Sequence, residues 1–400
     1  MHGSKAVSQL TTTLSDPGDN AMQEDDFGAA VAISGTTAIV GSSYVNQTEG
    51  AVYIYSDASG PWTLETTLSP PGSPLGSCFG CSVAITGTGP GATAIVGAPF
   101  GNRNKGGADI YVENAAGKWP RTPTQRLSAP APSRNDNFGT SVAVSGTGRS
   151  ATAIVGATGK SSGEGDAFIY SPTSTGKWSK VPSATLSDPR ARAGDDFGWS
   201  VAISGSGSGA TAVVGADEVN SSAGEADIYV EGATARAWPL TATLPDPGSN
   251  AGIGDQFGYS VSVAGTGPGA TTVIGAPTTS GDGSAYVYVE GATAGTWPLT
   301  TTFADPGGVP QDFFGGTVAM SSTGPGATAV ISADGNTHNE GVTYVEAEGS
   351  TTSSWSPTSL ADPGATTHDY FGFAVAVAGS TVIVGSEGFN SFAGAAYIYG

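Results

Sequence analysis

The residues that could carry out acid–base or metal chemistry are few, and they are scattered along the 400-residue chain. Histidine occurs only at His2, His338 and His368, so no histidine cluster indicates a zinc or copper site. HExxH and P-loop patterns are absent from the sequence. His368 is a candidate general base with Asp369 or Asp312, and an ordinary loop histidine is the alternative.

Acidic groups are far more abundant, with 34 Asp and Glu against 14 Lys and Arg and a formal net charge of −20. They would suffice for a glycosidase pair, but the distance between two carboxylates decides that mechanism. The acidic excess repels phosphate groups, so we expect no nucleic-acid partner and no binding to anionic membranes. No stretch approaches the ~20 apolar residues of a membrane span, so we expect no membrane insertion.

Two cysteines, Cys78 and Cys81, flank a Phe-Gly dipeptide in the motif CFGC. One CxxC without a second pair or a nearby histidine supplies at most half of a zinc site. The pair is a disulfide candidate in an oxidising compartment, provided that the backbone turns enough to bring the Cα atoms within about 7 Å. Two free thiols are the alternative.

The same Phe-Gly dipeptide occurs seven times, 52 to 60 residues apart, and divides the chain into seven similar units. Each unit contains four apolar segments separated by turn-rich stretches, as in FGWSVAISG, ATAVVGA, ADIYV and AWPLTATLPDP. The short runs, the β-branched residues and the Gly/Pro punctuation predict strands. The units start near Phe27, Phe79, Phe138, Phe197, Phe257, Phe314 and Phe371.

Seven four-stranded units predict an all-β, seven-bladed propeller, because sheets packed radially bury faces that a single sheet leaves exposed. A β-solenoid is the competing architecture. The last unit ends after three strand segments, and residues 11–17 (TTTLSDP) match the fourth-segment endings of other units. We therefore expect one propeller domain over residues 1–400, with four antiparallel strands per blade and an N-terminal strand that completes the last blade.

Recurrence assigns structural roles to several residues. The Phe of each dipeptide is expected to be a wedge between sheets, and its Gly to adopt a positive φ. A Trp recurs near the start of the fourth strand, which predicts packing between blades: Trp62, Trp119, Trp178, Trp238, Trp297 and Trp355. Six units carry an Asp two residues before the Phe, with Ser77 in the seventh, and this Asp is expected to accept hydrogen bonds from turn amides, with a cation-binding ring as the alternative.

With its FG dipeptides and with Gly-Ala-Pro at 97–99 and 275–277, the chain resembles the FG-GAP repeat family, which includes the propeller of integrin alpha chains. The resemblance implies the propeller fold, and its members serve as adhesion modules, lectins and enzyme appendages. Family members often bind calcium in the hairpin between the first two strands. Those hairpins lack a carboxylate here, so we expect neither family-type calcium sites nor another cofactor: 34–37, 86–92, 145–151, 204–210, 264–270, 322–327 and 378–381.

The residue after each FG varies between units: Ala29, Cys81, Thr140, Trp199, Tyr259, Gly316 and Phe373. This position is expected at the mouth of the central channel. Trp199, Tyr259 and Phe373 therefore predict an aromatic wall for a sugar or another flat ligand, and a simple plug of the channel is the alternative.

The loops between second and third strands also vary, and we expect them on the same face of the propeller. They contribute further ligand-binding candidates, each of which has an ordinary solvated loop residue as its alternative: Tyr44, Phe100, Arg103, His338 and Phe389.

These patterns favour a monomeric extracellular or cell-surface recognition or adhesion module that binds a glycan or a protein without catalysis. The N-terminus lacks the apolar core of a secretory signal, so we expect any such signal to be missing from this sequence. The alternative is a carbohydrate-active hydrolase or lyase that uses loop carboxylates with Tyr259, Tyr44 or His368. A structural spacer or a symmetric scaffold is a third interpretation.

Overall fold

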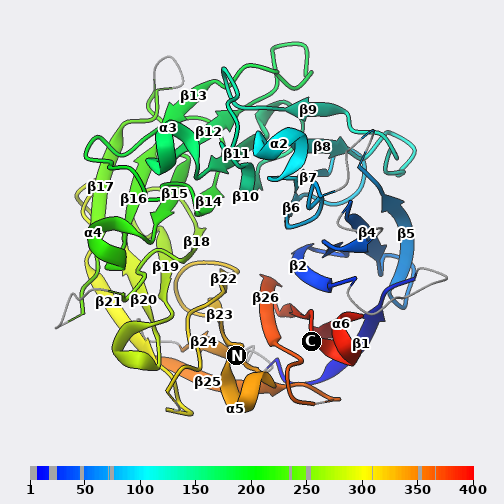
Figure 1. Ribbon diagram of the computed structural model, residues 1–400, viewed down its shortest axis with the longest axis vertical. Helices are drawn as coiled ribbons and strands as arrows, with labels where there is room; N and C mark the ends of the chain where they lie inside the picture. Colours follow the sequence, from blue (N-terminus) through cyan, green and yellow to red (C-terminus); the bar gives the residue numbers. More distant parts are fainter. Residues whose placement is uncertain are drawn as a thin grey trace.

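Seven four-stranded antiparallel sheets surround a central axis in the computed structural model, which is therefore a seven-bladed β-propeller (Figure 1). The first strand of each blade lies near the axis, and the fourth lies at the outside (Figure 1). The structure describes residues 7–17, 25–45, 49–70, 72, 76–233, 237–248, 254–308, 310–349, 354–364 and 366–400.

The strands of blades 1 to 4, from the inside outward, are β2 (Phe27–Ser34), β3 (Thr37–Ser42), β4 (Ala51–Ser56) and β5 (Thr63–Leu68); β6 (Ser82–Thr86), β7 (Thr93–Gly97), β8 (Ala108–Val112) and β9 (Gln125–Leu127); β10 (Phe138–Ser145), β11 (Thr152–Ala157), β12 (Asp166–Tyr170) and β13 (Ala184–Leu186); and β14 (Ser200–Ser204), β15 (Thr211–Ala216), β16 (Glu225–Val230) and β17 (Leu240–Pro245).

Those of blades 5 to 7 are β18 (Ser260–Ala264), β19 (Thr271–Ala276), β20 (Ser284–Val289) and β21 (Leu299–Ala304); β22 (Val318–Met320), β23 (Thr328–Ala333), β24 (Val342–Glu348) and β25 (Trp355–Ala361); and β26 (Phe371–Ala378), β27 (Thr381–Ser386), β28 (Ala395–Tyr399) and β1 (Leu10–Ser15). Strand β1 pairs with β28, so residues from both ends of the chain share blade 7.

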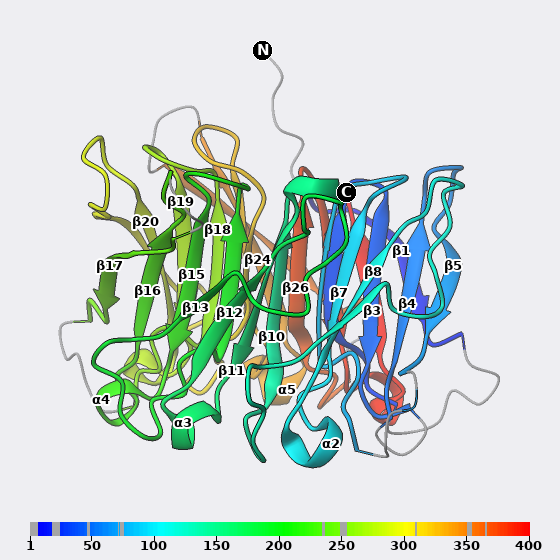
Figure 2. The same ribbon diagram turned by 90° about the horizontal axis from the view of Figure 1, so that it is seen from above.

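Short helical turns follow the second strand in most blades: α2 (Gly101–Asn104), α3 (Lys160–Gly163), α4 (Val219–Ser222), η2 (Thr279–Gly281), α5 (Asn336–Asn339) and α6 (Phe389–Phe392). A further 3-10 turn, η1 (Gly148–Ser150), lies in the first hairpin of blade 3. Figure 2 shows α2 to α5 at one end of the propeller and the C-terminus at the other. We call the end with the helical turns the loop face. In the described part of the chain, no helix has the length and hydropathy that crossing a bilayer requires.

The FG phenylalanines are wedges between neighbouring blades, as the repeat predicted. Each of the seven has no exposed surface, and each lies in a different hydrophobic cluster that joins two adjacent sheets. Phe257, for example, packs on Tyr286 of its own blade with ring centroids 5.6 Å apart. Full burial of an aromatic side chain stabilises by about 2 to 3 kcal/mol, so the wedges supply much of the cohesion between blades.

The recurrent tryptophans also pack between blades, and Trp119, Trp178, Trp238 and Trp297 are buried there. Their expected place at the start of the fourth strand is wrong for blades 2 and 3. Trp119 and Trp178 lie six residues before β9 and β13, which are only three residues long. Proline-containing segments, PRTPT and SKVPS, follow these tryptophans and shorten the strand, because proline cannot donate to a sheet ladder.

Six units carry an Asp two residues before the Phe, with Ser77 in blade 2, and in blades 3 and 7 this Asp holds the preceding turn, as expected. Asp136 and Asp369 accept hydrogen bonds from the amides of Ser133 and Thr366, three residues earlier, at 2.7 and 2.6 Å. Asp312 accepts instead from the side-chain amide of Asn336 at 2.7 Å. These contacts fix the backbone just before the FG dipeptide.

A hydroxyl on the inner strand links most neighbouring blades. Ser82, Ser141, Ser200, Ser260 and Thr317 each donate to the carbonyl of the next blade's FG glycine, at 2.7 to 2.9 Å. Blades 1 and 7 carry Ala30 and Ala374 at this position, so the two junctions around blade 1 lack this link.

Candidate functional site

Every blade forms the same four-residue turn around its FG dipeptide. The residue before the Phe has φ between 52° and 57° in all seven units, and its carbonyl accepts a hydrogen bond from the amide of the residue after the Gly. The glycines have φ between 92° and 101°. At Gly258 a Cβ would also lie 2.3 Å from the Glu225 carbonyl, so only glycine fits. The turn thus sets two variable side chains of each blade side by side.

Residues at these paired positions in blades 1 and 3 to 7 line a cavity of about 750 Å³ at the loop-face end of the channel. Three of the predicted residues meet there: Trp199, Tyr259 and Phe373. Phe313 and Tyr370, which precede the FG in blades 6 and 7, join them. The rings of Trp199 and Tyr259 are 5.5 Å apart between centroids. Trp199, Phe373 and Phe313 are 36%, 37% and 43% exposed, so their surfaces are open to a ligand.

The cavity is asymmetric around the axis. All its aromatic side chains come from blades 4 to 7, whereas blades 1 to 3 contribute the small residues Ala29, Ser82 and Thr140. Further along the inner strands, one valine from each blade lines the cavity: Val31, Val83, Val142, Val201, Val261, Val318 and Val375. The aromatic side chains of blades 4 to 7 thus form an arc on one side of the cavity, which we call the aromatic arc, and the seven valines form an apolar ring further along the channel.

Polar groups of the cavity are acidic or neutral. Gln256, Asn339 and Asp334 line it, and among the described residues no Lys, Arg or His does. Asn339 donates from Nδ2 to the Tyr370 hydroxyl at 3.1 Å, which orients both side chains. The amide and carboxylate oxygens can therefore accept hydrogen bonds from a ligand that stacks on the aromatic arc.

Three blades place a carboxylate directly after the second strand: Asp217, Asp334 and Glu387. Burial raises the pKa of Asp334 to about 6, of Asp217 to about 7 and of Glu387 to about 8. Burial also raises the pKa of the Tyr259 hydroxyl, and the charges of Asp334 and Asp217 raise it further. Tyr259 therefore lies within electrostatic reach of both carboxylates.

Asp334 is the carboxylate that reaches the cavity, and a neighbouring glycine explains why. Blade 6 has Gly316 after its FG, where other blades have larger side chains. A Cβ on Gly316 would lie 3.3 Å from Asp334 Oδ1, so the missing side chain leaves this oxygen open to the cavity. Asp217, in the blade that carries Trp199, is only 2% exposed.

The other predicted ligand residues do not line the cavity. Tyr44 and Phe100 are 49% and 48% exposed on second-to-third-strand loops, and Arg103 and His338 lie exposed on α2 and α5. Phe389 is half-buried and packs edge-on against Tyr397, with centroids 6.4 Å apart.

His368 is exposed, and its ring lies 6.4 Å from that of Tyr370. Asp369 accepts hydrogen bonds from the Thr366 amide and hydroxyl, and Asp312 from Asn336. Both acids are 1% exposed.

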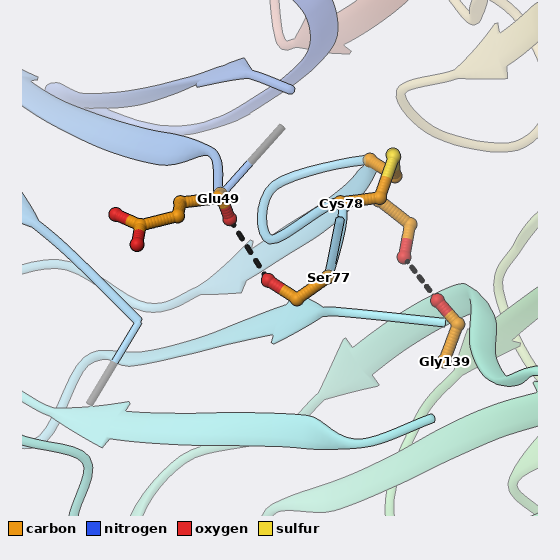
Figure 3. The surroundings of a disulfide bond; sticks show 6 residues. Glu49, Ser77, Cys78 and Gly139 are labelled. Atoms are coloured by element: carbon orange, nitrogen blue, oxygen red, sulfur yellow. Dashed lines mark hydrogen bonds between the residues drawn. A yellow bond between two sulfur atoms is a disulfide. The ribbon is translucent and has the colours of Figure 1, made fainter. Parts of the chain in front are cut away.

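Cys78 and Cys81 form a disulfide across the FG turn of blade 2, with Cα atoms 5.5 Å apart. They occupy the same paired positions that carry Asp196 and Trp199 in blade 4. Beside the bond, Ser77 donates from Oγ to the carbonyl of Glu49 in the blade 1 loop at 2.9 Å (Figure 3). The disulfide thus joins the two positions that flank the FG dipeptide of blade 2, and neither cysteine lines the cavity.

Outside the cavity, the carboxylates of Asp188, Glu225 and Asp227 gather at the junction of blades 3 and 4, with oxygens within 4.8 Å of one another. Arg190 donates to Glu225 at 2.9 and 3.0 Å and to Asp188 at 3.2 Å. Burial raises the pKa of Glu225 to about 7 and of Asp227 to about 6. The Arg190 guanidinium thus pairs with this carboxylate cluster and forms an ion-pair network with it.

The residues that the sequence did not single out are Phe313, Tyr370, Gln256, Asn339 and Asp334. The signal for the first three was present, because the residue before FG varies between units as strongly as the residue after it. Asn339 and Asp334 belong to a variable loop that the sequence did mark as part of the binding face.

Comparison with known proteins supports the fold. The chain resembles the structure of Sqt1 from Saccharomyces cerevisiae with a TM-score of 0.51 and 9% identity, over 95% of this chain and 84% of that one. This likeness shows the fold alone. A search of the curated proteins found no match.

A family model for the FG-GAP repeat matches residues 17–55, 122–170, 178–230, 240–288 and 358–399, which is more than half of the chain. The matches miss the FG turns of blades 2 and 6, where the disulfide and Gly316 stand. The repeated turns, the phenylalanine wedges and these matches together show that the chain belongs to the FG-GAP repeat family.

Proposed function

We propose that this protein is an extracellular recognition module that binds a glycan in the cavity at the loop-face end of its channel. The observation that carries the proposal is the convergence of Trp199, Tyr259, Phe313 and Phe373 on one cavity that also contains amide and carboxylate acceptors. A volume of about 750 Å³ lies within the range of about 300 to 1,000 Å³ that is typical of ligand sites.

Sugars suit this lining because their C–H faces pack on aromatic rings while their hydroxyls donate to Gln256, Asn339 and Asp334. The extracellular setting is supported by the family, whose repeats are typical of extracellular proteins. We propose that the module acts as a monomer, and that a protein segment is the alternative occupant of the same cavity.

A glycan array followed by calorimetry on the best binder tests the proposal. Trp199→Ala should weaken binding at least about tenfold, because it removes a central aromatic anchor. Phe100→Ala is the matched control, since Phe100 is a similarly exposed aromatic residue of the loop face that lies outside the cavity. Equal losses in the two variants, or no glycan binder at all, would contradict the proposal.

The same samples decide between recognition and catalysis. Reducing-sugar or unsaturated-product release from the bound glycan would favour the carbohydrate-active enzyme. Binding without turnover supports the recognition module.

A further inference from the structure

We propose that the glycan bound in the channel cavity carries a protonated amine, as in a hexosamine without its acetyl group, and that Asp334 pairs with this amine. This inference rests on the proposed function and names the ligand class of the same site.

The charges around the cavity give the first argument. Asp334 lines the cavity, Asp217 and Glu387 occupy the same position in blades 4 and 7, and no Lys, Arg or His lines the cavity among the described residues. A carboxylate or sulfate on a sugar would meet Asp334 without a compensating cation, which costs free energy in a desolvated site. Acidic glycans are therefore disfavoured, and neutral or cationic ones remain.

The exposure of Asp334 gives the second argument. Gly316 leaves Oδ1 uncovered on the cavity side, whereas Asp217 is almost completely buried. An ammonium group that reaches Oδ1 forms a charge-assisted hydrogen bond in a partly desolvated place, where such bonds are about twice as strong as neutral ones. A neutral hydroxyl or acetamide at the same place gains less, because it leaves the carboxylate charge without a counter-ion.

The aromatic residues next to Asp334 give the third argument. Phe313 belongs to the same turn as Gly316, and the pKa of Tyr259 responds to the Asp334 charge. An organic cation beside Asp334 is therefore within reach of aromatic faces, which attract cations through their quadrupoles. A bare calcium ion would need six or more oxygens and usually several carboxylates, whereas Asp334 is the only carboxylate among the described residues of this lining.

The test compares two ligands that differ by one charge: the β-1,4 trimer of N-acetylglucosamine, and the same trimer with one acetyl group removed. Calorimetry at constant ionic strength should give affinity for the amine form about tenfold to hundredfold higher. Asp334→Asn should bring the ratio of the two affinities near one. Glu65→Gln is the matched control, because it removes the same charge from an exposed position on the outer strand β5 and should leave the ratio unchanged.

Gly316→Ala provides a second variant that keeps the carboxylate. Its added methyl group would lie 3.3 Å from Asp334 Oδ1 and should lower the affinity ratio without removing a charge. Far-UV circular dichroism verifies that each variant retains its β structure.

Equal binding of the two trimers would overturn the amine assignment and leave glycan recognition standing. A preference for the amine that Glu65→Gln lowers as much as Asp334→Asn would overturn it too, because the net acidity of the protein would then explain the preference. Failure of both trimers to bind rejects this ligand class, and the Trp199→Ala comparison on the array glycans decides the proposed function separately.

Discussion

Glu346 provides a test of how burial controls the stability of this propeller. It lies on β24 and is 4% exposed. The equivalent third-strand position holds tyrosine in the other six blades: Tyr55, Tyr111, Tyr170, Tyr229, Tyr288 and Tyr399. Burial raises the pKa of Glu346 from 4.5 to about 7. We predict that Glu346→Gln stabilises the protein at pH 8 and has little effect at pH 4.5.

The sign and size follow from proton linkage. Because the folded pKa is higher, the folded state binds more protons than the unfolded state between pH 4.5 and about 7. The free energy of unfolding therefore falls as pH rises through this window. A rise from 4.5 to about 7 corresponds to about 3 kcal/mol, at about 1.4 kcal/mol per pKa unit, and this is the gain expected for Glu346→Gln at pH 8.

Urea unfolding followed by tryptophan fluorescence, at half-unit steps from pH 4.5 to 8.5, measures this difference. Glu65→Gln is the control, because it removes the same charge from an exposed position on β5. Other buried carboxylates, such as Asp217 and Glu387, add to the pH dependence of every variant, so the difference between curves isolates Glu346. A gain that is the same at pH 5 and pH 8 would refute the reasoning.

Three further predictions concern the junctions between blades, and urea unfolding measures each. Ala374→Ser should add the missing hydroxyl link to the Gly28 carbonyl and raise the free energy of unfolding by about 1 kcal/mol. Ser260→Ala should lower the free energy of unfolding by at least as much, and a loss in both variants would contradict the role of the link. Gly106→Ala should cost several kcal/mol, because its Cβ would lie 2.0 Å from the Phe138 carbonyl. Gly89→Ala, at a similar φ in open space, should cost only about 1 kcal/mol, and equal costs would exclude the contact as the cause. Replacing Cys78 and Cys81 by alanine should cost at most about 2 kcal/mol, since six other blades form the same turn without a disulfide; loss of the fold would show that blade 2 depends on it.

The fold could be predicted in detail because the same residues recur at the same positions in each unit. Phe, Gly and Asp recur at fixed offsets, and the roles expected from that recurrence are confirmed at Phe257, Gly258 and Asp136. Strand ends were less predictable where the repeat is interrupted. Proline-containing segments shorten β9 and β13, and the Trp119 and Trp178 pattern gave no sign of this.

The candidate site also contains residues that were predicted from the sequence and residues that were not. The residue that follows each FG dipeptide was predicted to lie at the channel mouth, because a position that repeats in the sequence also repeats around the ring. Trp199, Tyr259 and Phe373 line the cavity there. The residue before each FG dipeptide varies as strongly, but it was not predicted to line the cavity, so Phe313 and Tyr370 were missed. Only the turn, whose residue before the Phe has a left-handed backbone conformation, brings the positions before and after FG together.

The sequence by itself determined the number of blades, the wedge between them and the place of Trp199, Tyr259 and Phe373 at the channel mouth, because these depend on local periodicity. Only the tertiary structure decided that Tyr44, Phe100, Arg103 and His338 stay outside the cavity and that Gly316 exposes Asp334. The physical reason is that distance from the axis and cover by a neighbouring side chain arise from the packing of separate blades, which no single unit encodes.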